Sequence, residues 1–561
     1  MYRKWFRCGR VATLLFACCA FASPARAQFL SGRVVDSIAR FPVPGVVVML
    51  LDSAGSTLAR NLTNERGEYR VALRDAARTA RFVKIGFTPR EVSLPAPLNS
   101  ATRLDVSMLA LPNLIQAVHV TANSRCRVRK DRAQALGLWE QARAGLLATI
   151  VAREESPGKV VRLGFFRVMD GNSERIERMR VESDSAEGTG KTYTAAQEAA
   201  DFVRYGFSTD SLASATYYGP DADVLLSSAF GSAYCFEIAD HDRSRPHQIG
   251  LRFIPANPQK GRVDIDGTLW IDSVARELRD VEYKYLNVEA GARRYNPGGY
   301  VSFHAMKNGV VLIDRWWIRL VNAMPDTTVD DKGNLRYHDW VYAEEDGGEL
   351  ARASWPDSLE WRASLGALRL HAITRDKKPA TGTVISLVAT HYYGTADANG
   401  NVEMKELLPG PYSVRVIDPR IAELGIGWPT NVNFIAKRDT TSVATLVVPT
   451  TESRIADQCV VNHQWTVGDS LFTIGRVVTP DGRPVNEARV DFFVKGSGGQ
   501  WIPGDAYFKT GTNGMFEFCH RFAPPTDVKY RVTREGIVPL EAEGQFTSSL
   551  LVVKLTVLPR P

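Results

Sequence analysis

The fold class is decided by a stretch near the amino end that reads SGRVV (31–35), PGVVVML (44–50) and NERGEYRV (64–71). Short runs alternate between apolar and polar residues, and turns containing Gly, Pro, Asn or Asp separate them, which is typical of β-strands. A further run, TRLDV (102–106), completes the module. Together these segments predict a small antiparallel β-sandwich.

The same order of segments returns near the carboxyl end as IGRVV (474–478), PDGRPV (480–485), ARVDFF (488–493) and TNGMFEF (512–518). A weaker copy lies between the two and reads TGTVI (381–385), DANGNV (397–402) and LPGPYSVRV (408–416). In each copy a glycine follows Asn where the chain must reverse, because Gly adopts φ > 0 without penalty. The sequence therefore predicts three related sandwiches.

The three copies share the pattern G-x-V, P-V-x-x-A/V-x-V and N-x-x-G-x-F/Y, which resembles the carboxypeptidase regulatory-like family. The first and last copies match well, and the middle one only in its second half. The resemblance implies a transthyretin-like β-sandwich, often classed with carbohydrate-binding-like folds. It implies fold more firmly than function, because such sandwiches are widely reused as spacers.

A second resemblance concerns the first module and the stretch LIQAVHVTA (114–122) that follows it. Together they are similar to the N-terminal region of TonB-dependent outer-membrane receptors. No plug domain follows here, and the remaining chain lacks the series of amphipathic strands that a receptor barrel needs. The similarity is interpreted as a shared envelope part.

The central part differs from the modules. Leu136, Trp139, Leu146, Leu147 and Ile150 recur at helical spacing within 130–155, which predicts one long amphipathic helix, and strands dominate the rest. The predicted fold class is mainly β: three small immunoglobulin- or transthyretin-like β-sandwiches flank a central α+β domain with an antiparallel sheet and one long helix. The expected domains are a signal peptide (1–27), a sandwich (28–122), the central domain (123–346), a divergent sandwich (365–450) and a last sandwich (459–561).

The signal peptide is predicted from basic residues, the apolar run VATLLFACCAF (11–21) and the small-x-small site ARA (25–27). Five basic residues and no acids lie in 1–27, so its removal lowers the formal net charge from +7 to about +2. A nearly neutral chain does not predict a nucleic-acid partner. The alternative is lipoprotein cleavage before Cys18. Neither cleavage leaves a transmembrane segment in the mature chain.

Four cysteines remain after signal cleavage, and an even number in an oxidising compartment suggests two disulfides. Proximity favours Cys126–Cys235 and Cys459–Cys519, although four cysteines allow three pairings. No CxxC or HxxxH pattern indicates a metal site.

No catalytic, metal or cofactor motif is found in the sequence. None of the nine histidines has Glu three positions later, as a zinc peptidase would need, and neither a nucleophile elbow nor a phosphate loop is present. The nearest candidates are His241 with His247, the acid pair Asp264 and Asp266, and the acidic run 344–346. Each is also explained as a polar surface feature.

Aromatic residues of the central strands are the remaining candidates. The candidate ligand-lining residues are Trp270, Tyr283, Tyr285, Trp316 and Trp317. The order of strands and hairpins is similar to the half-barrels of lipoprotein-carrier domains, which hold acyl chains. Core packing and a sugar- or protein-binding platform are the alternatives for these aromatics.

We expect a non-enzymatic, exported envelope protein, periplasmic or associated with the outer membrane, that acts as a scaffold or binding module. Its central domain would hold an apolar ligand, and its partner is an envelope protein, a lipid or a glycan. The first alternative is a surface carbohydrate-binding or adhesion protein, which an aromatic row of Trp501, Tyr507 and Phe508 on a sandwich face would support. The second alternative is a hydrolase in the central domain.

Overall fold

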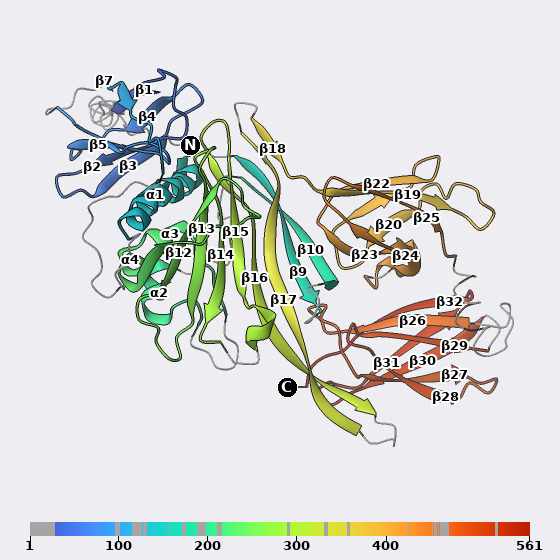
Figure 1. The fold of residues 1–561 in the computed structure, drawn as a ribbon. Coiled ribbons are helices and arrows are strands. Elements are labelled where there is room, and N and C mark those ends of the chain that lie inside the picture. The colour runs from blue at the N-terminus through green and yellow to red at the C-terminus, as the bar shows by residue number, and fades with distance from the viewer. Residues whose placement is uncertain are drawn as a thin grey trace, which may run out of the picture. The chain divides into compact units, whose positions relative to one another are not determined.

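The computed structural model describes residues 28–95, 101–114, 126, 132–155, 158–170, 175–187, 198–209, 216–288, 292–329, 335–355, 359–425, 427–450, 453, 457, 459, 471–521 and 525–560. The expected signal peptide and its cleavage sites lie outside these residues. The chain forms two compact units, one of 1–164, 171–173 and 184–362, the other of 165–170, 174–183 and 363–561. The fold is mainly β, with three sandwiches and a central α+β domain, as predicted (Figure 1).

The first sandwich has eight strands in two sheets. They are β1 (Phe29–Asp36), β2 (Val47–Leu51), β3 (Thr57–Leu62), β4 (Glu68–Ala72), β5 (Thr79–Val83), β6 (Arg90–Ser93), β7 (Ala101–Arg103) and β8 (Val106–Met108). One sheet has the order β4-β1-β7, with β8 also paired to β1, and the other has the order β3-β2-β5-β6.

The second and third sandwiches repeat this topology. The second contains β19 (Gly366–Ile373), β20 (Val384–Leu387), β21 (Tyr393–Thr395), β22 (Asn401–Leu407), β23 (Gly410–Ile417), α5 (Pro419–Ala422), β24 (Trp428–Ala436) and β25 (Thr441–Val447). The third contains β26 (Leu471–Val478), β27 (Arg489–Lys495), β28 (Trp501–Lys509), β29 (Met515–His520), β30 (Thr526–Thr533), β31 (Leu540–Phe546) and β32 (Leu550–Thr556). Their sheet orders are β22-β19-β25 with β21-β20-β23-β24, and β29-β26-β32 with β28-β27-β30-β31.

The expectation of an antiparallel sandwich does not hold for every pairing of the first strand in each copy. The first strand pairs in parallel with the last: β1 with β7 and β8, β19 with β25, and β26 with β32. Such a pair joins segments from the two ends of a module, so no local turn signal could have revealed it. Because the pair recurs in all three sandwiches, the middle copy has the complete topology despite its partial sequence match.

The repeated turn explains the shared glycine of the first and third copies. Gly67 has φ +71° and Gly514 has φ +73°. A Cβ atom would lie 2.4 Å from the carbonyl oxygen of Val34 at Gly67, and 2.5 Å from that of Val477 at Gly514. The glycine carbonyls accept hydrogen bonds of 2.8 Å from the amides of the same two valines. The turn is therefore locked onto the first strand, and only glycine fits.

The central domain consists of a sheet with helices on one face. Its elements are α1 (Arg132–Glu155), β9 (Lys159–Met169), β10 (Ile176–Glu187), α2 (Ala199–Tyr205), α3 (Ala222–Leu226), α4 (Ser228–Ala233), β11 (Tyr234–Ile238), β12 (Gln248–Pro255), β13 (Asp264–Asp272), β14 (Glu277–Leu286), a 3-10 turn (Ala292–Tyr295), β15 (Gly298–Ala305), β16 (Val311–Val329), β17 (Leu335–Ser354) and β18 (Glu360–Arg362). The sheet order is β10-β9-β17-β16-β15-β14-β13-β12-β11, with β18 paired to β17. The sheet thus extends past Asp346, because β17 continues to Ser354.

The first sandwich is joined to the central domain by a common core. Val47 and Met49 project from the β3-β2-β5-β6 sheet, and Ile85 follows the end of β5. All three pack with the buried face of α1, which lies beneath that sheet (Figure 1). The amide of Gly86 donates a 2.8 Å hydrogen bond to Oε1 of Gln141 on α1. Because Val48 and Leu50 fill the sandwich core, β2 is buried on both faces. Its uninterrupted apolar sequence is typical of such a strand.

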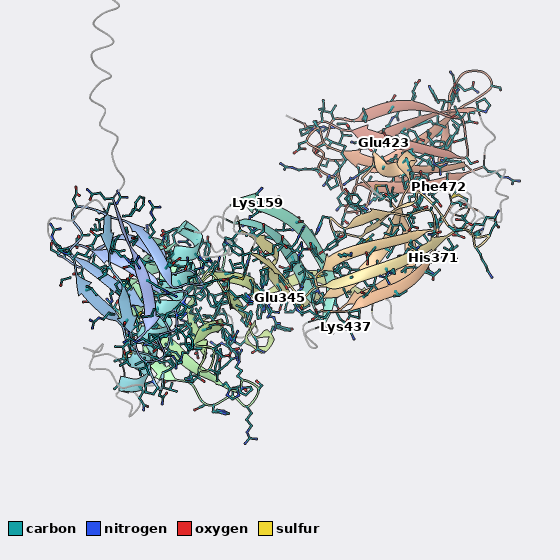
Figure 2. The ribbon with its side chains drawn as sticks, turned by 90° about the horizontal axis from the view of Figure 1, so that it is seen from above. Lys159, Glu345, His371, Glu423, Lys437 and Phe472 are labelled. Carbon is teal, nitrogen blue, oxygen red and sulfur yellow. A yellow bond between two sulfur atoms is a disulfide. The ribbon has the colours of Figure 1, made fainter. Side chains whose placement is uncertain are left out.

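Both disulfides have the favoured pairing, Cys126–Cys235 and Cys459–Cys519. Cys459 and Cys519 belong to a small core between the second and third sandwiches, to which α5, β24 and β26 contribute. Phe472 lies in this core, and Figure 2 shows it near Glu423, just after α5. In the part of the chain described, no helix has the length and apolarity needed to cross a bilayer.

Candidate functional site

The five candidate ligand-lining residues of the central sheet are closely packed. Trp270, Tyr283, Tyr285 and Trp316 are buried, and the last three belong to the core beneath α1. The hydroxyl of Tyr285 donates a 2.8 Å hydrogen bond to the carbonyl of Tyr218. Trp317 is half-buried on the opposite face, where its ring stacks on that of Tyr300 with the centroids 6.1 Å apart.

The face of the central sheet opposite α1 holds a network of charged groups around Trp270. Arg245 lies over the indole, 4.7 Å from its centroid, and donates to both carboxylate oxygens of Asp280 at 3.0 and 2.9 Å. The indole Nε1 of Trp270 donates a 2.8 Å hydrogen bond to Glu282. Burial raises the pKa of Asp280, and the Arg245 guanidinium opposes that shift. These are the contacts of a satisfied structural network, because every charge has a partner.

The other candidates for chemistry have structural partners too. Asp264 bonds to Arg262 at 3.2 Å, and Asp266 bonds to Arg252 at 2.7 and 2.9 Å. His241 and His247 are exposed in a loop between β11 and β12. In the residues described, no group of three or more His, Cys, Asp or Glu side chains is arranged to hold a metal ion.

A row of aromatic side chains lies on the outer face of the third sandwich. On β27, Val490 and Phe492 point into the core, so Phe493 points outward. Tyr507 on β28 is paired with Asp491, and Trp501 is paired with Lys495, which places both rings on that outer face. The row covers about 13 Å, the distance between the first and last of five strand residues. We call Trp501, Phe493 and Tyr507 the aromatic row.

Every ring of the aromatic row has a cation over it. Arg489 lies 4.1 Å from the centroid of Tyr507, Lys529 lies 4.9 Å from that of Trp501, and Arg531 lies 5.1 Å from that of Phe493. The cations are in turn paired with acids on the same face. The ion pairs are Arg489–Asp491 at 2.7 Å, Lys495–Asp527 at 3.3 Å, Arg531–Glu541 at 2.7 Å, and Lys529 with Glu541 at 3.5 Å and with Glu543 at 3.7 Å. The charges on this face therefore balance closely.

The same face is used differently in the first sandwich. There the outward positions of the β3-β2-β5-β6 sheet carry Val47, Met49 and Val83, and these side chains share a buried core with α1. In the third sandwich most outward positions carry charged or aromatic side chains. Tyr507, one of them, is 51 % exposed. The outer face of the third sandwich is therefore accessible to a partner, whereas the corresponding face of the first sandwich is buried against α1.

The expected row of Trp501, Tyr507 and Phe508 is corrected at one position. Phe508 is paired with Val490 and stacks on Phe518 inside the sandwich, with centroids 4.4 Å apart. Neighbouring strand residues face opposite ways, so Tyr507 and Phe508 could not share a face. The third ring is Phe493, and the same alternation along Val490 to Lys495 would have identified it from the sequence.

None of the five central aromatics lines either of two pockets formed by described residues. One, of about 220 Å³, lies in the first unit where the first sandwich meets the central domain. The other, of about 810 Å³, is an open groove of the second unit formed by 175–177, 409–411 and 435–438. An apolar ligand surrounded by those five aromatics is therefore not supported by the described cavities.

Comparisons with solved structures give weak likenesses. The Bacillus anthracis TIE protein is 14 % identical, with a TM-score of 0.14 and coverage of 58 % of both chains. A streptococcal ancillary pilin is 12 % identical, with a TM-score of 0.15 and coverage of 40 % of this chain and 82 % of the pilin. The 3-chlorocatechol 1,2-dioxygenase from Rhodococcus opacus 1CP is 14 % identical, with a TM-score of 0.14 and coverage of 17 % of this chain and 60 % of the enzyme. The chain thus spans about three-fifths of the dioxygenase and of the TIE protein, and TM-scores this low carry no argument.

A search of curated proteins finds no match to the chain. A family model matches one part of this chain, which coincides with β1 to β8 of the first sandwich. Residues 30–109 match the carboxypeptidase regulatory-like domain, which confirms the resemblance for the first of the three copies.

Proposed function

We propose that this chain is an exported, non-enzymatic binding protein of the bacterial envelope that binds a neutral glycan through the aromatic row of its third sandwich. The observation that carries the proposal is the exposed outer face of β28-β27-β30-β31, where three rings stand in line. The other sandwiches and the central domain act as the frame that presents this face.

Export is supported by the two disulfides, which persist in oxidising compartments. The basic, apolar and small-residue segments of 1–27 have the order of a secretory signal. We assign the mature chain to the periplasm or to association with the outer membrane.

The chemistry of the face favours a sugar. The C–H groups of a pyranose ring pack on aromatic faces, and its hydroxyls both donate and accept hydrogen bonds. Arg489, Lys529 and Arg531 can donate to such hydroxyls, and Asp491 and Glu541 can accept from them. Because the ion pairs on this face neutralise one another, a neutral ligand suits it better than a polyanion.

A scaffold with an apolar ligand in the central domain has less support, since three of the five aromatics proposed to line that site are packed in the core and none of the five lines either described pocket. A hydrolase in the central domain has less support for a similar reason. Its candidate acids, Asp264 and Asp266, are each bonded to an arginine.

The proposal is tested by titrating the purified mature protein against an array of neutral oligosaccharides. Trp501→Ala and Tyr507→Ala should each weaken binding about tenfold, which corresponds to about 1.4 kcal/mol. The matched control is Tyr393→Ala, which removes a 74 % exposed ring from β21, the strand of the second sandwich that corresponds to β28. Its binding should equal that of the wild type.

Two results would contradict the proposal. One is a wild-type protein that binds none of the neutral oligosaccharides at millimolar concentration. The other is an equal loss of binding in the Tyr393 and Trp501 variants, because binding would then not depend on the aromatic row.

A further inference from the structure

The pocket of about 220 Å³ in the first unit is lined by five separate segments of the chain. The first sandwich contributes the loop before β2 and the residues after β5. The helix α1 contributes Ala144, Gly145 and Ala148. The β13–β14 and β15–β16 hairpins supply the remaining walls. The pocket therefore exists only because the first sandwich is docked on the central domain.

Close contact between backbones holds these walls together. Gly45 has φ +68° and Gly309 has φ +87°, and both line the pocket. A Cβ on Gly309 would lie 2.6 Å from the Cα of Gly45, and a Cβ on Gly45 would lie 3.2 Å from the Cα of Gly309. The sandwich loop and the hairpin thus meet without side chains between them, which keeps the space beside them open.

One end of the pocket is cationic. The ammonium group of Lys84 donates a 2.7 Å hydrogen bond to the carbonyl of Pro44, the one acceptor that it bonds in the part of the chain described. Arg276 and the exposed Lys307 also line the pocket, and Glu277 is the single acid among its lining residues. The lining residues therefore carry two more positive than negative charges.

Burial lowers the pKa of Lys84 to about 8, while Glu277 acts against this shift and Arg276 adds to it. At neutral pH the amine is still mostly protonated, so a poorly hydrated cation remains in the wall. Such a cation gains most from an anion placed against it, because the low local dielectric strengthens the attraction.

The other end of the pocket is apolar. Ile85, Ala148, Leu278 and Val311 line it, from the sandwich, α1 and both hairpins. An apolar cavity of about 150 Å³ accommodates benzene, so a pocket of this volume has room for one small ring or a short chain.

From the cationic end, the apolar end and the volume, we infer that this pocket binds a small monocarboxylate with a short apolar body. Its carboxylate pairs with the ammonium of Lys84, and its body packs against α1 between Ile85 and Leu278. This site lies in a different unit from the aromatic row and does not depend on glycan binding.

The test is calorimetric titration of the mature protein with sodium benzoate and with benzyl alcohol, a neutral ligand of similar size. Benzoate should bind at least tenfold more tightly than benzyl alcohol. Lys84→Met should remove that preference, because it keeps the length of the side chain and loses the charge. Lys307→Glu, at an exposed position, should weaken the binding of benzoate threefold or more without affecting the fold. The affinity of this variant for benzyl alcohol should equal that of the wild type.

A second readout follows the amine itself. Bound benzoate should raise the pH at which Lys84 becomes reactive toward an amine-acetylating reagent, with modification located by mass spectrometry. The inference is overturned if the wild type binds benzoate no better than benzyl alcohol. It is also overturned if both lysine variants bind benzoate as the wild type does.

Discussion

The side chain of Ile85 occupies the space that a Cβ on Gly145 would need: such an atom would lie 2.7 Å from Cδ1 of Ile85. Ile85 belongs to the first sandwich and Gly145 to α1, so the missing side chain lets the two approach closely. The contact is continuous with the core shared by the sandwich and the central domain.

Replacing Gly145 should therefore loosen this docking. Gly145→Val should lower the free energy of unfolding by about 1–3 kcal/mol, because extra methyl groups in a packed contact force neighbours to move. Urea denaturation measures the loss, and hydrogen exchange should show faster exchange in β2 and β5. Gly231→Val in α4 is the control, since its Cβ meets nothing within 4 Å. Equal losses in both variants would show that the contact with Ile85 does not matter.

The turn glycine of the third sandwich should tolerate no side chain. Gly514→Ala should destabilise the protein by about 3 kcal/mol, since it adds a clash with the backbone oxygen of Val477 to the cost of positive φ. Gly482→Ala is a matched control, with φ +82° and open space around its Cβ, and should cost about 1 kcal/mol. Urea midpoints give both values. Similar values for the two variants would contradict the role assigned to the hydrogen-bonded turn.

The Cys459–Cys519 disulfide closes a loop of 60 residues. Replacing both cysteines by Ala should lower the free energy of unfolding by about 4 kcal/mol on the chain-entropy model. Chemical denaturation of this double variant and of the wild type measures the effect. Tryptophan fluorescence monitors unfolding, because Trp428 lies in the adjoining core. A loss below 1 kcal/mol would indicate that the loop is constrained by other contacts.

The third sandwich should lose stability in acid through His520. Burial lowers the pKa of His520 to about 3, and the ring stacks on Phe492 with the centroids 3.8 Å apart. The unfolded chain binds a proton at a pKa near 6.5, so stability is fully present above that pH and decreases as the pH falls from about 6.5 toward 3.

His520→Phe should make this part of the stability profile flatter, because a ring that cannot titrate takes its place. Thermal denaturation at intervals between pH 7 and pH 4 measures the slope. His371→Phe, at an exposed position of the second sandwich, is the control and should leave the slope unchanged. An unaltered slope in the His520 variant would refute the assignment.

Much of the fold could be predicted because its signals are local. Alternation along Val490 to Lys495 and the Asn-Gly turns indicate strands and reversals within a few residues. The sequence also favoured the disulfide pairing. Local patterns do not identify β11 and β17, whose pairing partners are defined by the whole sheet. The expected position of Phe508 was wrong, because neighbouring strand residues face opposite ways and Phe508 cannot share a face with Tyr507.

By itself, the sequence determined the three modules, their turns and the α+β character of the centre, since short-range periodicity and backbone sterics are sufficient for these. Only the tertiary structure decided which sandwich face is covered and which is exposed. The same sheet lies under α1 in the first copy and carries the aromatic row in the third. The pocket at Lys84 likewise required five separate segments of the chain to meet. Contacts between distant segments depend on packing of the whole unit, and no local pattern encodes them.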